Sequence, residues 1–211
     1  MENPIEKKSS SSRYSSWAFG VDSIQNWASW DKAFSPEECL KIIEIGESKI
    51  LGFASVASRN NNVGIVQLSQ RYSTIAWLYP SDNMKWVYRR VTDVITSLNN
   101  QYFKFDLFGL TEARRPFQFT KYEAPGGFFG MHKDMLAGYP IRKLSMTLQL
   151  SDPEDYEGGE LVLLLGKEAE ILSKEQGKMI CFPSYLLHEV RPVTKGTRYS
   201  LVAWVTGKAF K

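Results

Sequence analysis

The chain contains two histidines, and both lie beside residues that suit a metal site. His132 begins the triplet His132-Lys133-Asp134, and His188 closes an apolar stretch later in the chain. Residues i and i+2 of a strand point to the same face, so His132 and Asp134 are predicted to converge. Two imidazoles and one carboxylate form the facial ligand set that favours non-haem Fe(II) and leaves coordination positions open. We therefore predict a metal site made by His132, Asp134 and His188.

Each of these residues also has an ordinary interpretation when it is taken alone. A His-x-Asp triplet is usually a surface pair, and a single histidine after an apolar strand is usually a hydrogen-bonded core residue. Catalytic zinc also accepts two histidines and a carboxylate, but the His-Glu-x-x-His motif common in zinc hydrolases is absent here. A zinc or manganese hydrolase or isomerase, and a metal-free binding module, stay open as alternatives.

A candidate anion-binding residue, Arg198, follows His188 in the chain. Residues 191–197 are predicted to turn the chain into a neighbouring antiparallel strand, which would place Arg198 beside His188 and deeper in the barrel. A guanidinium directed into an apolar interior is costly unless an anion pairs with it, and its planar fork suits a carboxylate. A dicarboxylic keto acid would bridge the two features, with one end on the metal and the other on Arg198.

Further residues are predicted to line the same cavity. Tyr122 precedes the first ligand strand, and we expect its hydroxyl to hydrogen-bond the co-substrate. Four residues that alternate along predicted strands are candidates for the cavity wall: Thr147, Gln149, Leu161 and Leu163. Ordinary core packing is the alternative for these four.

Two helices are predicted to support this site. Ser35, Pro36 and Glu38 form an N-terminal capping signal, which predicts a helix over 36–51. Apolar residues at spacings of three and four predict a second helix over 83–99, and 71–78 is predicted to be a strand.

The second half of the chain changes to the period of two that is typical of strands. The predicted strands are 115–122, 128–134, 143–151, 160–165, 168–172, 178–182, 187–190 and 198–206. Short antiparallel strands after two helices predict an α+β, mainly β, fold: a double-stranded β-helix jelly roll with N-terminal supporting helices. Residues 1–16 are predicted to be a flexible lead-in.

The bulk composition excludes several classes of protein. A net charge of +3 with scattered basic pairs argues against a nucleic-acid partner. No apolar run approaches the ~18 residues of a membrane span, and the N-terminus has no apolar stretch typical of a secretory signal. Cys39 and Cys181 are predicted to be buried thiols in a reducing compartment. We expect a cytoplasmic protein that does not associate with a membrane.

Several segments resemble the iron- and 2-oxoglutarate-dependent dioxygenases of the prolyl 4-hydroxylase superfamily, most closely the PKHD-type hydroxylase branch. The segments that carry the resemblance are 122–126, 132–134, 144–153, 156–161, 182–184 before His188, and 191–198. The resemblance is strong over about 119–204 and fainter from Phe34. It implies one dioxygenase domain over 17–211, with helical support over about 34–100 and a jelly-roll core over about 101–207.

The resemblance also implies roles for the site residues. His132, Asp134 and His188 would bind Fe(II), and Arg198 would bind the distal carboxylate of 2-oxoglutarate, with Tyr122 as a further contact. Fe(II), 2-oxoglutarate and O2 are the expected cofactors and co-substrates, and ascorbate is a candidate addition. 2-Oxoglutarate would be oxidised to succinate and carbon dioxide while an unactivated C–H bond is hydroxylated. The presence of a carboxylate at Asp134 favours hydroxylation, because related halogenases lack it.

Two positions near this site leave questions open. Gln149 stands where several animal prolyl hydroxylases have a tyrosine that touches the co-substrate. Which polar side chains contact 2-oxoglutarate here is therefore an open question. Trp204 falls where the family often has an aromatic residue near the site, with a packed core tryptophan as the alternative.

The substrate that we favour is a prolyl residue in a protein or peptide, with a free amino acid or other small molecule as the alternative. Residues 58–70 are either a substrate lid or a plain surface loop. The oligomeric state, monomer or dimer, stays open.

Overall fold

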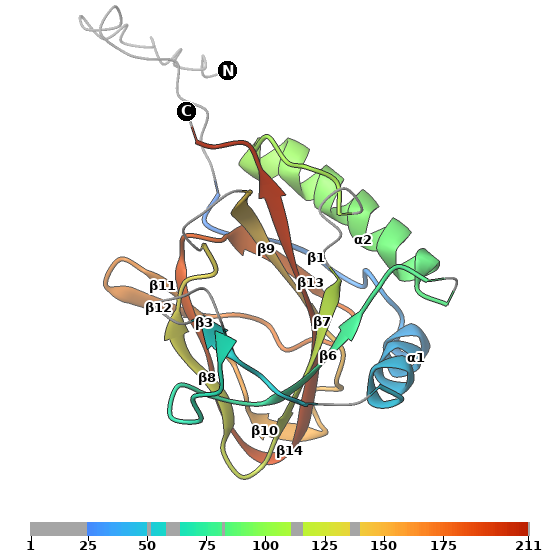
Figure 1. Cartoon of the computed structure of the whole chain (residues 1–211), viewed down its shortest axis with the longest axis vertical. Helices are drawn as coiled ribbons and strands as arrows, with labels where there is room; N and C mark the ends of the chain where they lie inside the picture. The colour runs from blue at the N-terminus through green and yellow to red at the C-terminus, as the bar shows by residue number, and fades with distance from the viewer. Residues whose placement is uncertain are drawn as a thin grey trace, which may run out of the picture.

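Two antiparallel sheets form the body of the protein, and one long strand belongs to both (Figure 1). The computed structural model describes residues 25–49, 52–57, 64–81, 83–110, 116–135 and 140–210, so the predicted lead-in over 1–16 lies outside the described residues. This double-sheet arrangement is the predicted jelly roll.

The first sheet has the strand order β1-β13-β9-β14-β7-β6-β2. Its strands are β1 (Ala28–Trp30), β13 (Met179–Pro183), β9 (Ile141–Gln149), β14 (Leu187–Gly207), β7 (Phe117–Glu123), β6 (Thr74–Leu78) and β2 (Gly52–Phe53). The second sheet pairs β14 with β8 (Gly127–His132), β11 (Leu161–Leu165) and β10 (Tyr156–Gly158), with β5 (Arg71–Tyr72) beside β8 and β12 (Glu168–Ile171) beside β11. A separate short pair joins β3 (Val56–Ala57) and β4 (Gly64–Ile65).

Strand β14 overturns one prediction from the sequence. Residues 191–197 do not turn the chain back, because β14 continues from Leu187 to Gly207. Its first part pairs with β8 and its second part with β7 and β9. The register shifts between His188 and Val193, and Gly196 has a φ of +70°, so these residues bend the strand from one sheet into the other.

Two further predicted strands are also shorter or broken. The strand predicted over 128–134 ends at His132, so Asp134 lies beyond β8. The strand predicted over 71–78 is interrupted at Ser73, where the chain leaves β5 in the second sheet and enters β6 in the first. Where β8 ends and where the chain passes from β5 to β6 depends on pairing with strands that are distant in the sequence. The local periodicity of the sequence does not indicate that pairing.

The helices lie on one side of the first sheet (Figure 1). Helix α1 (Pro36–Glu47) starts as predicted, with Ser35 and Glu38 in a reciprocal capping box, but it ends before the predicted residue 51. Helix α2 (Lys85–Leu98) continues into a π-helical turn, η2 (Asn99–Phe103). Among the described residues, no helix is long and apolar enough to cross a membrane.

Alternation along the strands of the first sheet separates an apolar face from a polar one. The residues packed against the helices include Phe117, Phe119, Leu144, Met146, Leu148, Leu201, Ala203 and Val205. The alternate residues of the same strands are mostly polar yet buried: Gln118, Thr120, Ser145, Thr147, Gln149, Arg198 and Ser200. The helices therefore cover the apolar face, and the polar face is turned toward the space between the sheets.

Both cysteines are free and buried, as predicted. Burial raises the pKa of the Cys39 thiol to about 12 and also raises the pKa of Cys181. Both side chains therefore behave as small apolar groups of the core.

Close packing between α1 and β7 generates a stability prediction. A Cβ atom added at Gly46 would lie 2.5 Å from ring atoms of the buried Phe119. Gly46→Ala should therefore lower the free energy of unfolding by about 1–3 kcal/mol, despite the better helix propensity of alanine. Urea denaturation measures this change. Gly52→Ala is the control, because no atom lies within 4 Å of the added Cβ, and an equal loss in both variants would contradict the packing argument.

Candidate metal centre

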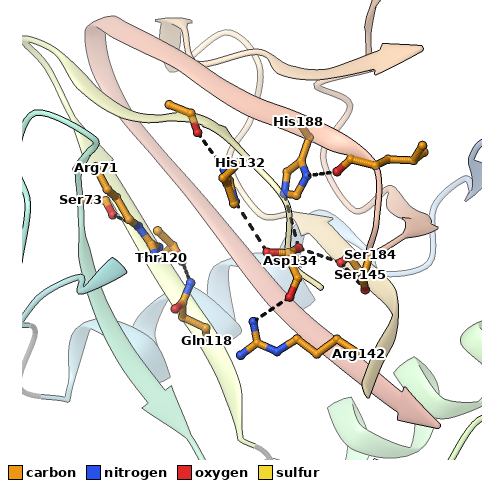
Figure 2. A network of polar contacts seen from close by, with 12 residues as sticks. Arg71, Ser73, Gln118, Thr120, His132, Asp134, Arg142, Ser145, Ser184 and His188 are labelled. Carbon is orange, nitrogen blue, oxygen red and sulfur yellow. Dashed lines mark hydrogen bonds and ion pairs between the residues drawn. The ribbon is translucent and has the colours of Figure 1, made fainter. Parts of the chain in front are cut away.

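Three donor side chains from different parts of the chain meet at one end of the cavity (Figure 2). His132 ends β8 and lies directly opposite His188 of β14 in the strand register. His132 Nε2 lies 3.6 Å from Asp134 Oδ1, and His188 Nε2 lies 3.4 Å from Asp134 Oδ2. The ligand atoms of all three residues lie within 4.8 Å of one another, so one ion can contact all of them.

Backbone carbonyl groups fix both imidazoles in the form that a metal requires. His132 Nδ1 lies 2.8 Å from the Gly130 carbonyl oxygen, and His188 Nδ1 lies 3.0 Å from that of Leu186. A carbonyl oxygen only accepts hydrogen bonds, so each Nδ1 carries the proton when these bonds form. Each Nε2 then has a free lone pair directed at Asp134, which is the usual arrangement of metal-binding histidines.

Aromatic rings hold the imidazole planes in place. Phe129 stacks on His132 with ring centroids 3.5 Å apart, and Phe182 meets His188 edge to face at 4.8 Å. These contacts restrict rotation of both imidazoles before any ion arrives.

Asp134 is held by the backbone of a different loop, because it lies beyond β8. Its N–H donates to the Ser184 carbonyl oxygen at 3.1 Å, and Ser145 Oγ donates to Asp134 Oδ2 at 2.7 Å. Ser184 Oγ lies 2.9 Å from Ser145 Oγ and extends this polar chain. The prediction that strand alternation aligns His132 with Asp134 is therefore wrong in its mechanism, although the two side chains do meet.

The three donors also set one another's protonation. Burial opposes ionisation of Asp134, which is 6% exposed, but the two imidazoles hold its pKa well below its usual range. Burial lowers the pKa of His132, and repulsion from His188 adds to this effect. Burial also disfavours charge on His188, but the contact with Asp134 outweighs it and raises the pKa of that imidazole. A divalent ion would displace any proton from His188 when it binds.

Arg198 lies on the same strand as His188 and points into the same cavity. Its side chain is 1% exposed, and Nη2 donates to Gln149 Oε1 at 2.9 Å. Nε and Nη1 are buried and have no hydrogen-bond partner among the described residues. A buried guanidinium with unpaired donors and only neutral neighbours suits a carboxylate ligand.

The structure brings together most of the residues that the sequence singled out. Tyr122, Thr147, Leu161 and Trp204 line the cavity that contains the three donors and Arg198. Gln149 instead holds Arg198, and its Nε2 also contacts the Ser173 carbonyl oxygen. Leu163 packs in the core cluster between the sheets and does not line the cavity.

Sequence reasoning missed Arg71 and Ser145. Ser145 alternates with Thr147 and Gln149 along β9, so period two was a usable signal for it. Arg71 lines the cavity because β5 pairs with β8, a contact that no local pattern reports. The sequence leaves the segment 58–70 open between a substrate lid and a plain surface loop. Its residues 58–63 lie outside the described residues, and the Gln70 carbonyl oxygen accepts a backbone hydrogen bond from Gly130.

Comparisons with known proteins agree with this geometry. Residues 117–206 match the model of the 2OG-Fe(II) oxygenase superfamily. A PKHD-type hydroxylase of Thermosynechococcus vestitus is 35% identical over 123 residues, which cover 56% of this chain and 54% of that protein. The chain therefore spans about half the length of the curated relatives it matches. These matches confirm the resemblance to the iron- and 2-oxoglutarate-dependent dioxygenases.

Solved structures confirm the fold. A Trichoplax adhaerens prolyl hydroxylase, in complex with a hypoxia inducible factor peptide fragment, has a TM-score of 0.69 at 19% identity and covers 86% of this chain and 84% of its own. A viral collagen prolyl hydroxylase from Paramecium Bursaria Chlorella virus-1, in a 2-oxoglutarate complex, has a TM-score of 0.62 at 18% identity and covers 87% and 97%. The predicted jelly roll with supporting helices is therefore confirmed.

The hydrogen bond from Ser145 to Asp134 generates a prediction about metal affinity. Ser145→Ala should weaken Fe(II) binding about 10- to 100-fold, because the carboxylate loses the donor that orients it. Anaerobic titration calorimetry measures the affinity. Ser97→Ala, on the exposed face of α2, should leave the affinity unchanged. Equal affinity in both variants would remove Ser145 from the support of this site.

Proposed function

We propose that this protein is a dioxygenase that uses Fe(II) and 2-oxoglutarate to hydroxylate a prolyl residue of a protein or peptide. The observation that carries the proposal is the convergence of two imidazoles and one carboxylate beside a buried arginine with unpaired donors. This set matches a ferrous ion plus a diacid better than it matches a closed structural metal site.

His132, Asp134 and His188 would hold the iron on one face and leave the opposite face free for co-substrate and oxygen. Arg198 would hold the distal carboxylate of 2-oxoglutarate, with Gln149 fixing one edge of the guanidinium. The Tyr122 ring lies 5.3 Å from the Arg198 guanidinium carbon and would close one side of the carboxylate site. Thr147 and Leu161 would form further walls of the co-substrate pocket.

Iron bound at these residues would couple oxidative decarboxylation of 2-oxoglutarate, which gives succinate and carbon dioxide, to hydroxylation of a C–H bond. The protein contributes the preset donors, the anion site and a largely buried cavity that limits access of water. The single catalytic domain over 17–211, ascorbate as an accessory factor and a cytoplasmic location belong to this proposal.

A prolyl substrate is supported by the relatives and structural neighbours, which are a PKHD-type hydroxylase and two prolyl hydroxylases. Free amino acids, a metal-free binding module and an oxygen-independent zinc or manganese enzyme are the competing functions. Incubation with Fe(II), 2-oxoglutarate and a host lysate tests the proposal, since peptides should gain one oxygen atom only when 2-oxoglutarate is present. Turnover without oxygen would contradict it.

Removal of a proposed ligand should abolish activity without unfolding the protein. Asp134→Ala and His132→Ala should each reduce Fe(II)-dependent succinate formation to background, because two donors remain for an ion that needs three. Asp93→Ala, at an exposed position of α2, is the control. Circular dichroism should show the same secondary structure in all three variants. Succinate formation at the normal rate in either ligand variant would refute the assignment.

Loss of the buried guanidinium should affect 2-oxoglutarate specifically. Arg198→Ala should weaken 2-oxoglutarate binding by about 3 kcal/mol, roughly 150-fold, because a buried ion pair is lost. Affinity for Fe(II) alone should stay unchanged. Arg191→Ala is a matched control on the same strand, where the side chain is 42% exposed. Unchanged 2-oxoglutarate affinity in the Arg198 variant would place the diacid elsewhere.

A further inference from the structure

A second hollow of about 310 Å³ opens outside the metal ligands. We call this hollow the vestibule, and its walls include Arg71, Gln118, Lys133, Arg142, Trp77 and Trp204. It shares six residues with the inner cavity: Arg71, Gln118, Phe129, His132, Asp134 and Trp204. Lys133 and Arg142 line only the vestibule, and Arg198 lines only the inner cavity. A substrate that approaches the metal centre through the vestibule therefore meets Arg142 and Lys133 but not Arg198, the residue proposed to hold 2-oxoglutarate.

Arg71 is a buried cation with no carboxylate within ion-pair distance among the described residues, although the Asp134 charge acts on it from further away. Its side chain is 4% exposed, Nε donates to Ser73 Oγ at 2.9 Å, and the guanidinium carbon lies 4.4 Å from the centroid of the Phe129 ring. The Tyr122 hydroxyl is a further neutral neighbour. Burial of a guanidinium whose hydrogen-bond and ring contacts are neutral is costly, and an anion in the adjoining hollow would offset that cost.

A second arginine enters the vestibule from the Asp134 side. The Arg142 guanidinium carbon lies 4.2 Å from the centroid of a Trp204 ring, and Nη1 lies 3.4 Å from the Asp134 carbonyl oxygen. Figure 2 shows Arg71 and Arg142 reaching toward the region of Gln118 from different strands. Lys133 adds an exposed amine to the same wall.

In the part of the chain that the structure describes, the vestibule wall therefore has more basic than acidic side chains. Among the described residues of its wall, Asp134 is the one acidic side chain, and its oxygens contact both imidazoles and Ser145. Three basic side chains around a partly desolvated hollow favour an anionic ligand and disfavour a cationic one.

We propose that the substrate presents a carboxylate to the vestibule, between Arg71 and Arg142, next to the residue that is hydroxylated. This inference rests on the proposed hydroxylase function and adds a charge requirement to it. The planar donors of two arginines suit a carboxylate, and the adjoining Trp204 ring offers an apolar face for the neighbouring part of the substrate.

The proposed peptide substrate makes an acidic side chain of an extended polypeptide the source of this carboxylate, rather than a free amino acid. Trp77, which is 43% exposed, lines both the vestibule and a further hollow of about 280 Å³ beside Tyr79 and Met84. Trp77 therefore offers a partly exposed apolar ring in the vestibule wall to a neighbouring residue of that polypeptide.

Binding of fluorescent nine-residue peptides to the anaerobic protein, loaded with Fe(II) and 2-oxoglutarate, tests the proposal without turnover. Each peptide has one central proline, flanked by glutamate, glutamine or lysine. The glutamate peptide should bind at least ~10-fold tighter than the glutamine peptide, with the lysine peptide weakest, and the difference should shrink as salt is added. Free proline, added as a competitor, tests the alternative source of the carboxylate.

Three substitutions identify the residues responsible. Arg71→Gln and Arg142→Gln should each reduce the preference for glutamate over glutamine to less than ~3-fold. Lys195→Gln, at an exposed residue of β14 that does not line the vestibule, should preserve the full preference. Arg142→Gln keeps the test valid if the buried Arg71 variant does not fold.

Several outcomes would overturn the proposal. Equal binding of the glutamate and glutamine peptides, or no binding of any peptide or of proline, would exclude a carboxylate in the vestibule. Weakened 2-oxoglutarate affinity in the arginine variants, with the peptide preference intact, would assign these arginines to the co-substrate. Binding of free proline to the vestibule, with no binding of any peptide, would show that the carboxylate does not come from a polypeptide. Failure of the hydroxylase function would appear separately, as acid-selective binding without succinate formation once oxygen is admitted.

Discussion

The buried Asp134 carboxylate is the centre on which the rest of the site depends. It lies between two imidazoles whose Nδ1 atoms contact backbone carbonyl groups, so their Nε2 lone pairs face the carboxylate. These contacts hold three donors in position before an ion arrives, and an ion between them would reduce the cost of crowding them together. The arrangement requires the pairing of β8 with β14 and the backbone contact of Asp134 with Ser184.

In the first sheet of the jelly roll, alternate residues of a strand face either the helices or the cavity. Apolar residues of β9 such as Leu144, Met146 and Leu148 pack under the helices, and alternate residues place polar groups in the cavity. Two arginines, Arg198 and Arg71, are buried there with neutral partners. Arg71 also lines the vestibule and Arg198 does not, which gives a physical basis for treating co-substrate and substrate as two anions that bind at different places.

Residue chemistry made much of the site predictable. A chain with two histidines offers few ways to hold a transition metal, and the capping box at Ser35 fixed the start of α1. Long-range pairing was not predictable in the same way. The bend of β14 at Gly196 reads as a turn in the sequence, and Arg71 reaches the cavity only because β5 pairs with β8. Local periodicity carries no information about which strands become neighbours.

The most direct test of the account is an anaerobic crystal structure of the Fe(II)-loaded protein, with the metal located by anomalous scattering at the iron edge. The account predicts one iron bound by His132 Nε2, His188 Nε2 and an Asp134 oxygen at about 2.0–2.2 Å, the distance usual for nitrogen and oxygen ligands of such ions. Iron bound elsewhere, or an ion held by only one of these side chains, would contradict it.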